Sequence, residues 1–302
     1  GRILDLSAQG NVIWSCSPIW GPDGDVHVFF TRVPPPQNEW FRLFRTGGEI
    51  VHATAPAPEG PYEIHDTVLS GSMFARTWRE HGIVNPRVYA VDGRYALFYT
   101  AYEVPWPRDD MRERIGLMLS DDLWRWEDGN EGAPILSPAP SADAWDSKIV
   151  NNAAFVQKAP PGSYCLYYRG LRDLDSTYGI GLAAADALEG PYERVGSSAL
   201  VAPETVPTPP HGQACKGFED PCVWKEDGRL HMLVKDMGYF DQPGGCYLAS
   251  GDGIDWSRPE RGYYGAAHYW AEPGALDSPQ LLCEDGRPAY LFTNRFSGER
   301  GT

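Results

Sequence analysis

The sequence lacks the segments that mark several classes of protein. Its 302 residues contain no apolar run near the ~20 residues of a membrane-spanning helix, so no membrane is expected as a partner. It has no Lys/Arg-rich run and a formal net charge of −15, which argues against nucleic acid as a partner and against a polyanionic polymer as the main ligand. The six cysteines form no C-x-x-C pair, so a zinc ribbon is not expected and buried, reduced thiols are.

A starting methionine is also missing. Because the chain begins at Gly1, two locations fit the sequence: the cytoplasm, or the periplasm or extracellular space after removal of a signal peptide. In either case we expect a soluble protein. The sequence carries no signal for an oligomeric state.

Glycine, proline and aromatic residues, in contrast, are abundant. The chain has 33 glycines, 27 prolines, 16 tyrosines and 11 tryptophans. Tyrosine and tryptophan favour strands, while glycine and proline favour tight turns, so the composition predicts short strands joined by turns. A β-architecture of this length often forms a single domain.

A segment of two short strands recurs five times along the chain. Each copy has an apolar strand, an Asp-Gly or Pro-Gly turn and a second strand rich in aromatic and β-branched residues, which is the pattern of a β-hairpin. The copies begin at residues 17, 85, 152, 220 and 278, with spacings of 68, 67, 68 and 58 residues. They read SPIWGPDGDVHVFFTRV, NPRVYAVDGRYALFYTAYE, NAAFVQKAPPGSYCLYYRG, DPCVWKEDGRLHMLVKDM and SPQLLCEDGRPAYLFTNR.

A third strand and a polar turn follow each of the first four hairpins, and an aromatic residue then begins an expected fourth strand. These aromatic residues are Tyr62, Trp126, Tyr192 and Trp256. Four antiparallel strands per unit, repeated radially, define a β-propeller. We therefore predict an all-β fold, a single five-bladed β-propeller catalytic domain of four-stranded antiparallel blades over residues 1–302, with blades starting near residues 12, 80, 147, 215 and 273. The fifth unit ends just after its second strand, so its outer strands are expected from residues 1–10 or from beyond the sequence.

Polar residues open the innermost strand of each unit, where a propeller lines its central axis. The second strand of each unit runs back and also ends in polar residues, so polar groups are expected to converge on one mouth of the axis. A concave polar pocket with several carboxylates is the expected functional site. The aligned column holds Ser17, Asn85, Asn152, Asp220 and Ser278, and the column before it holds Cys16, Val84, Asn151, Glu219 and Asp277.

Glycoside hydrolysis needs two carboxyl groups, one to protonate the leaving oxygen and one to activate water or attack carbon. Asp220 and Asp277 come from neighbouring units and are the first candidates for this pair. Glu219 and Asp146 are the other carboxylates expected near the mouth, and His81 is a candidate acid or orienting group. A structural role is an open alternative for each, because Asp-Pro is common turn chemistry and Glu219 can pair with an arginine.

Amides, cations and indoles at the same positions are candidates for binding sugar hydroxyls or a uronate. The indoles can stack on sugar faces, although tryptophan also commonly belongs to a core. No metal-ligand spacing is present, and no organic cofactor is required; a cation or water on the axis is compatible with the polar columns. The candidate binding residues are Asn85, Arg87, Asn151, Asn152, Arg169, Lys235, Trp14 and Trp145.

The repeats resemble those of the five-bladed propeller glycosidases of glycoside hydrolase families 32, 43, 62, 68, 117 and 130. The resemblance spans nearly the whole chain and rests on EDPCVWKEDGRLHMLV, NPRVYAVDGRYALFYT, EGPYE and SDDLWRW. FEDPCVW followed by ALDSPQLL is most similar to family 117, whose members remove terminal anhydro-galactose from agar-type oligosaccharides by inversion. The chain departs from family 43, which has an Asp at the start of blades one and two and a Glu on blade three, where this chain has Ser17, Asn85 and Asn152.

The resemblance implies an exo-acting, inverting glycoside hydrolase that releases a terminal sugar from a plant or algal oligosaccharide. Two alternatives stay open. A glycoside phosphorylase or transglycosidase would use basic residues such as Arg87, Arg169 and Lys235, as the similarity to family 130 implies. A non-catalytic carbohydrate-binding propeller would keep the aromatic residues without a correctly spaced carboxylate pair.

Overall fold

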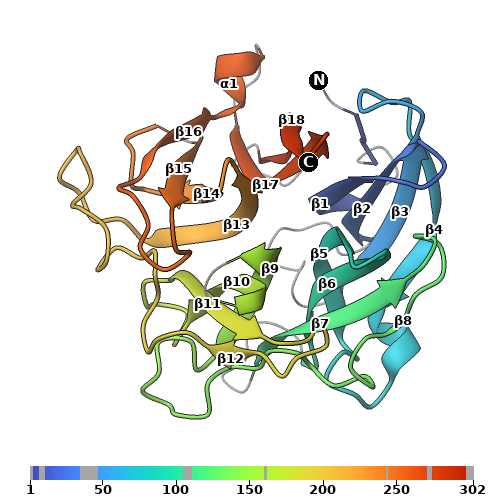
Figure 1. The fold of residues 1–302 in the computed structure, drawn as a ribbon, viewed down its shortest axis with the longest axis horizontal. Helices are drawn as coiled ribbons and strands as arrows, with labels where there is room; N and C mark the ends of the chain where they lie inside the picture. The colour runs from blue at the N-terminus through green and yellow to red at the C-terminus, as the bar shows by residue number, and fades with distance from the viewer. Residues whose placement is uncertain are drawn as a thin grey trace.

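The chain folds as a β-propeller that is built almost entirely from antiparallel strands (Figure 1). The computed structural model describes residues 3–6, 11–34, 47–104, 111–159, 162–242, 244–270 and 274–296. Among these residues, no helix is long and apolar enough to cross a membrane.

Successive strands pair with one another to form four four-stranded blades and a hairpin, and a parallel pairing of Glu113 with Ile149 joins blades two and three into one eight-stranded sheet. The first blade holds β1 (Val12–Trp20), β2 (Val26–Val33), β3 (Glu49–Ala55) and β4 (Glu63–Ser70). The second holds β5 (Gly82–Val91), β6 (Arg94–Tyr102), β7 (Glu113–Ser120) and β8 (Glu127–Asp128), and the third holds β9 (Ile149–Ala159), β10 (Gly162–Leu171), β11 (Gly179–Ala185) and β12 (Glu193–Arg194). The fourth holds β13 (Gly217–Glu226), β14 (Arg229–Met237), β15 (Gly244–Ser250) and β16 (Glu260–Tyr264), and the hairpin holds β17 (Ala275–Glu284) and β18 (Arg287–Phe296).

The five inner strands β1, β5, β9, β13 and β17 surround the centre of the molecule (Figure 1). Each packs against the next, and β17 and β18 pack against β1, so the ring is closed. The fifth sheet has two strands in the described residues. Residues 3–6 form no strand, although Leu6 packs in the core between blade one and β17–β18. The count of five complete blades therefore stays a prediction.

Apolar clusters fill the spaces between neighbouring blades. Phe98 and Phe155 stack between blades two and three, and Met232 and Val234 pack with residues of blade three. Burial of these faces supplies the main favourable term for closing the ring. All six cysteines are free thiols, and five of them are buried, as the sequence predicts.

Two short helices complete the described structure, the 3-10 turn η3 (Gly71–Phe74) and α1 (Ala266–Tyr269). Three of the four predicted aromatic residues directly precede a fourth strand, namely Tyr62, Trp126 and Tyr192. In blade four, Trp256 instead makes an isolated bridge to Ser250, and β16 begins four residues later.

Candidate active site

Every inner strand carries an irregularity at the same point near the axis. One residue there has left-handed backbone torsions, with φ between 47° and 55°, and the ladder to the second strand changes register around it. Such torsions are uncommon for residues other than glycine, and Asn and Asp tolerate them best. The five residues are Ser15, Asn85, Asn152, Asp220 and Ser278.

The predicted alignment is correct in four blades and wrong in blade one. Here the register shift falls between Trp14 and Cys16, so Ser15 occupies the position predicted for Ser17, and Trp14 occupies the position predicted for Cys16. The Ser-Pro pair at residue 17 imitates the Asn-Pro pair of blade two, but its serine accepts a hydrogen bond from the Val88 N–H instead. The sequence pattern does not indicate where the bulge of blade one lies.

The left-handed residues form a chain of hydrogen bonds around the axis. The Asn85 amide donates to Asn152 Oδ1, and Asn152 Nδ2 donates to Asp220 Oδ1 at 2.5 Å. The Ser278 N–H donates to Asp220 Oδ2 at 3.2 Å. Asn85, Asn152 and Asp220 are all buried, so these side chains hold the blades together rather than facing solvent.

Arg87 lies inside this ring and is 0% exposed. Its Nη1 donates to Ser15 Oγ at 2.5 Å, and its Nη2 lies 3.9 Å from Asp220 Oδ1. Burial and the charge of Glu219 raise the pKa of Asp220, against the opposing charges of Lys235 and Arg87. Arg87, predicted to bind substrate, is therefore a buried counter-charge of Asp220.

Just outside the ring, two carboxyl groups share one ammonium group. Lys235 Nζ lies 3.0 Å from Glu219 Oε1 and 3.0 Å from Asp277 Oδ2, and Arg169 Nε lies 3.3 Å from Glu219 Oε2. The side chains of Glu219 and Lys235 are each 14% exposed, whereas Asp277 is 1% exposed. The structure thus brings four of the predicted site residues into one cluster at the mouth.

The pKa values of the two carboxyl groups shift in opposite directions. Burial raises the pKa of Asp277 to about 6, and the Lys235 charge offsets only part of that rise. Burial also acts to raise the pKa of Glu219, but the charges of Lys235 and Arg169 outweigh it and leave that pKa below its ordinary value. Burial acts to lower the pKa of Lys235, but the surrounding carboxylates raise it above its ordinary value, so Lys235 stays charged.

Sequence reasoning missed Glu113, which extends this cluster. Glu113 opens β7, the third strand of blade two, and its Oε2 accepts a hydrogen bond of 2.6 Å from Asn151 Nδ2. Burial raises the pKa of Glu113, while Asn151 and Arg169 oppose that rise. Its position at the start of a strand was a signal, but β7 is a third strand and the predicted polar columns belong to the inner strands. Asn151, predicted to bind sugar, is thus occupied with a buried carboxyl group.

Two predicted residues lie in blade three away from the cluster. Asp146 is buried, accepting hydrogen bonds from Tyr168 Oη at 2.9 Å and from Arg194 Nε at 2.7 Å. Trp145 stacks on Tyr168 with ring centroids 5.8 Å apart and packs against Gly170 and Gly181. These contacts fit structural roles, because strands β10, β11 and β12 of blade three supply them.

The remaining two predicted residues approach the mouth from other blades. The ring of Trp14 lies 6.0 Å from Lys235 Nζ, within reach of a cation–π contact. The ring of His81 lies 5.6 Å from that of Tyr102, whose phenol has its pKa raised by burial and by Glu113. His81 is therefore on the blade-two side of the mouth. In the described part of the chain, no group of three or more His, Cys, Asp or Glu side chains could hold a metal ion.

The fold and the cluster of carboxylates and cations at its axial mouth can be compared with those of known proteins. No protein-family profile and no curated protein matches the chain. Solved structures do match: a family 117 glycoside hydrolase of the marine bacterium Zobellia galactanivorans has a TM-score of 0.70 at 16% identity, over 95% of this chain and 79% of that one. A thermostable family-43 glycoside hydrolase has a TM-score of 0.62 at 14% identity, over 94% and 83% of the two chains.

A third match extends the likeness to another propeller family. A GH32 β-fructofuranosidase of Bombyx mori has a TM-score of 0.64 at 14% identity, over 95% of this chain and 56% of that one. These similarities establish that the chain shares the β-propeller fold of the glycoside hydrolases it was predicted to resemble. At such low identity they speak to the fold alone.

Proposed function

We propose that the protein is a glycoside hydrolase whose active site is the axial mouth. The observation that carries the proposal is the pair of carboxyl groups, Glu219 and Asp277, that each lie 3.0 Å from the Lys235 ammonium and whose pKa values shift in opposite directions. A carboxylate that stays ionised beside a carboxyl group that keeps its proton up to a pH of about 6 is the pairing that glycoside hydrolysis needs. The fold shared with glycoside hydrolases supports the same conclusion.

Glu219 is the ionised, partly exposed member and acts as the nucleophile. It attacks the anomeric carbon while Asp277 gives its proton to the leaving glycosidic oxygen. Water then displaces Glu219 from that carbon and returns a proton to Asp277. Asp277 is 1% exposed, so the sugar reaches its Oδ2 only when the Lys235 ammonium moves aside. Catalytic contacts commonly form fully only in the complex with substrate.

This pairing bears on the stereochemical course. Glu219 Oε1 and Asp277 Oδ2 each lie 3.0 Å from Lys235 Nζ, so they are no farther apart than twice that distance. The carboxyl groups of retaining enzymes lie about 5–5.5 Å apart, and those of inverting enzymes about 6.5–9.5 Å. We therefore propose retention for this pair, in place of the inversion that the family resemblance implies.

Exo-action on a plant or algal oligosaccharide is the proposed mode. The charged groups of the mouth are largely buried, with Glu219 and Lys235 each 14% exposed. Groups with so little exposed surface are reached more readily by the end of a chain than by its middle. The substrate class is the one that the sequence resemblance to family 117 implies.

The same geometry bears on the two alternative functions, which are phosphorolysis and carbohydrate binding without catalysis. Phosphorolysis needs cations for phosphate, but Arg169 and Lys235 are paired with carboxylates and Arg87 is buried. The non-catalytic carbohydrate-binding propeller is supported by blades one to three, whose mouth positions hold Trp14, Val84 and Asn151 instead of carboxylates.

The deciding experiment is product analysis on agar, arabinan, xylan and fructan oligosaccharides, with and without phosphate. We expect phosphate-independent release of a monosaccharide, with the first-formed anomer matching the configuration of the substrate by ¹H NMR. Asp220→Asn and Asp277→Asn are measured beside the wild type. Binding of an oligosaccharide without any turnover would instead favour the binding propeller, and a sugar phosphate product would favour the phosphorylase.

A further inference from the structure

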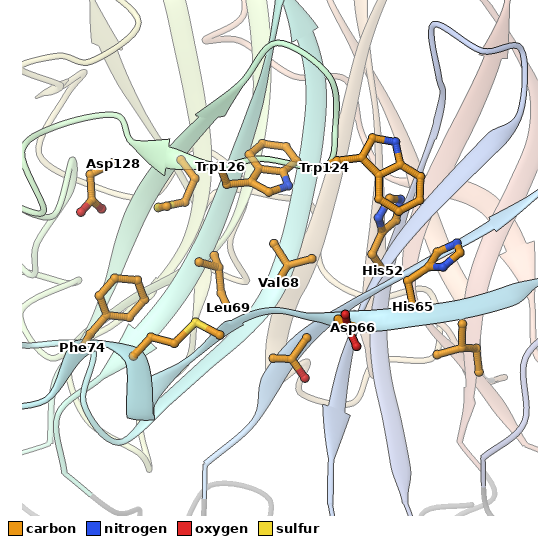
Figure 2. Close-up of a pocket in the computed structure, with 13 residues that line it drawn as sticks. His52, His65, Asp66, Val68, Leu69, Phe74, Trp124, Trp126 and Asp128 are labelled. Atoms are coloured by element: carbon orange, nitrogen blue, oxygen red, sulfur yellow. The ribbon is translucent and has the colours of Figure 1, made fainter.

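A cavity lies away from the axis, between the outer strands of blades one and two. It has a volume of about 860 Å³. Figure 2 shows Trp124 and Trp126 along one side of this groove, His52 and His65 near Trp124, and Phe74 towards the other end. Its volume lies within the ~300–1,000 Å³ range of small-molecule sites.

The β7–β8 turn holds Trp124 in place. Asp122 Oδ1 accepts hydrogen bonds of 2.8 Å from the backbone N–H groups of Trp124 and Arg125, and Ser120 Oγ accepts one of 2.9 Å from Leu123. Leu123 is fully buried although its φ of 67° is costly for a bulky residue. The turn is therefore rigid, and it presents an indole that is 48% exposed.

The matching turn of blade four provides an internal comparison. Ser250 and Asp252 make the same hydrogen bonds there, to Gly253, Ile254 and Asp255. The left-handed position is a glycine, Gly253, and the exposed position is an aliphatic residue, Ile254. The same turn geometry thus presents an indole over a groove in blade two and an aliphatic side chain in blade four.

The groove's surroundings specify the chemistry of a ligand. Trp124 packs against the rings of His52 and His65, with centroids 4.5 and 4.9 Å away, so its indole is braced on blade one. The carboxylate of Asp66 lies in the lining and can accept hydrogen bonds from hydroxyl groups, whereas Asp128, also in the lining, is paired with Arg79 at 2.5 Å. Asp66 also disfavours an anionic ligand, as does the net charge of −15. Because the two indoles lie along one side instead of enclosing one point, the groove suits an extended chain of rings.

We infer that this groove is a second carbohydrate-binding site, which takes a neutral oligosaccharide or polysaccharide chain stacked on Trp124 and Trp126. Indole faces stack on the apolar faces of pyranose rings, and the carboxylate of Asp66 orients their hydroxyls. The site would hold a polymer on the rim of the propeller while the axial mouth works on chain ends. Its occupant follows from the carbohydrate chemistry proposed for the mouth, but its binding can be measured without turnover.

The test is affinity electrophoresis through gels containing agarose, arabinan or xylan, with polygalacturonate as the anionic comparison. All variants carry Glu219→Gln so that hydrolysis cannot remove the polymer. We expect a neutral polysaccharide to retard the parent, and Trp124→Ala to weaken that binding about tenfold. Ile254→Ala, the matched change in blade four, should leave it unchanged. Trp124→Ile, which copies the residue of blade four, guards against a folding artefact, and thermal unfolding checks all four proteins.

Equal mobility of the parent and both Trp124 variants in every retarding gel would overturn the inference. So would retardation by none of the neutral polysaccharides, or by polygalacturonate alone, or tighter binding of a basic peptide such as polylysine. With Glu219 intact, Trp124→Ala should hydrolyse short oligosaccharides at the parental rate. Failure of hydrolysis in the wild type would contradict the proposed function, while groove binding would still be measured.

Discussion

The two halves of the axial mouth are built on one backbone and carry different chemistry. In blades one and two, the second strand ends at the mouth in a threonine whose hydroxyl accepts an N–H from the next blade: Thr31 from Asn85 at 2.9 Å and Thr100 from Asn152 at 3.3 Å. In blades three and four, the equivalent positions hold cations that reach carboxylates of the next blade. Arg169 pairs with Glu219, and Lys235 pairs with Asp277.

The comparison shows that equivalent positions of the repeat hold the blades together in one part of the mouth and provide charged groups in the other. Each of the first four blades touches the next blade at this point, and two of these four contacts are neutral hydrogen bonds while the other two are ion pairs. A neutral contact adds about 1 kcal/mol to stability. Buried ion pairs add little net stability because desolvation opposes them, yet they shift pKa values. The charged half is therefore where we place catalysis.

The largest expected effect is loss of turnover in Glu219→Gln. An amide cannot attack the anomeric carbon, so kcat should fall by about 10³-fold on any substrate that the wild type cleaves. Initial-rate kinetics measure this loss, and circular dichroism confirms the fold. Glu226→Gln, at the other end of β13, is the matched control and should keep wild-type activity. A Glu219→Gln enzyme with near-normal kcat would remove Glu219 from the mechanism.

Asp220→Asn should act chiefly on stability. Asp220 accepts from both Asn152 and Ser278 and faces the buried Arg87, but an asparagine offers one acceptor and no charge. Leaving Arg87 without its counter-charge should lower the free energy of unfolding by about 3 kcal/mol. Urea unfolding measures the change, with Asp227→Asn in an exposed turn as the control. Unchanged stability together with lost turnover would instead favour direct catalysis by Asp220.

The strands that form the scaffold were easier to predict from the sequence than the catalytic groups. Asp-Gly turns and alternating apolar residues act locally, so the five hairpins and the second-strand residues Arg169 and Lys235 could be placed from the pattern. The bulge of blade one could not, because its register depends on how Ser15 meets Arg87 from the next blade. This shift of two residues places Trp14 at the mouth instead of Cys16.

The site was harder to predict because burial and direction depend on tertiary packing. Glu219 and Asp220 were both candidates, and only the structure shows that the first is partly exposed while the second lies in the buried ring. Asp146 was expected near the mouth but is bound by Tyr168 and Arg194. Glu113 lies on a third strand, outside the columns that were aligned.

Asp277→Asn tests the acid role through pH. The protonated carboxyl is the active form, so kcat/KM of the wild type should fall as pH rises through about 6, the pKa of Asp277. Because this pKa is raised on folding, the associated stability is also present at low pH and is lost as pH rises through about 6. The variant should lose about 10²-fold in kcat and lose this limb of the profile. An unchanged limb in Asp277→Asn would assign the titration to another group.

The smallest expected effect belongs to the neutral half of the mouth. Thr31→Val keeps the shape of the side chain but removes the hydroxyl that accepts the Asn85 N–H, which leaves a buried donor unpaired. The free energy of unfolding should fall by about 1–2 kcal/mol while kcat/KM stays within about twofold of the wild type. Urea unfolding and initial rates measure both quantities, and Thr208→Val on an exposed loop is the control. If Thr31→Val cost as much activity as Glu219→Gln at unchanged stability, the mouth would not divide into a supporting half and a catalytic half.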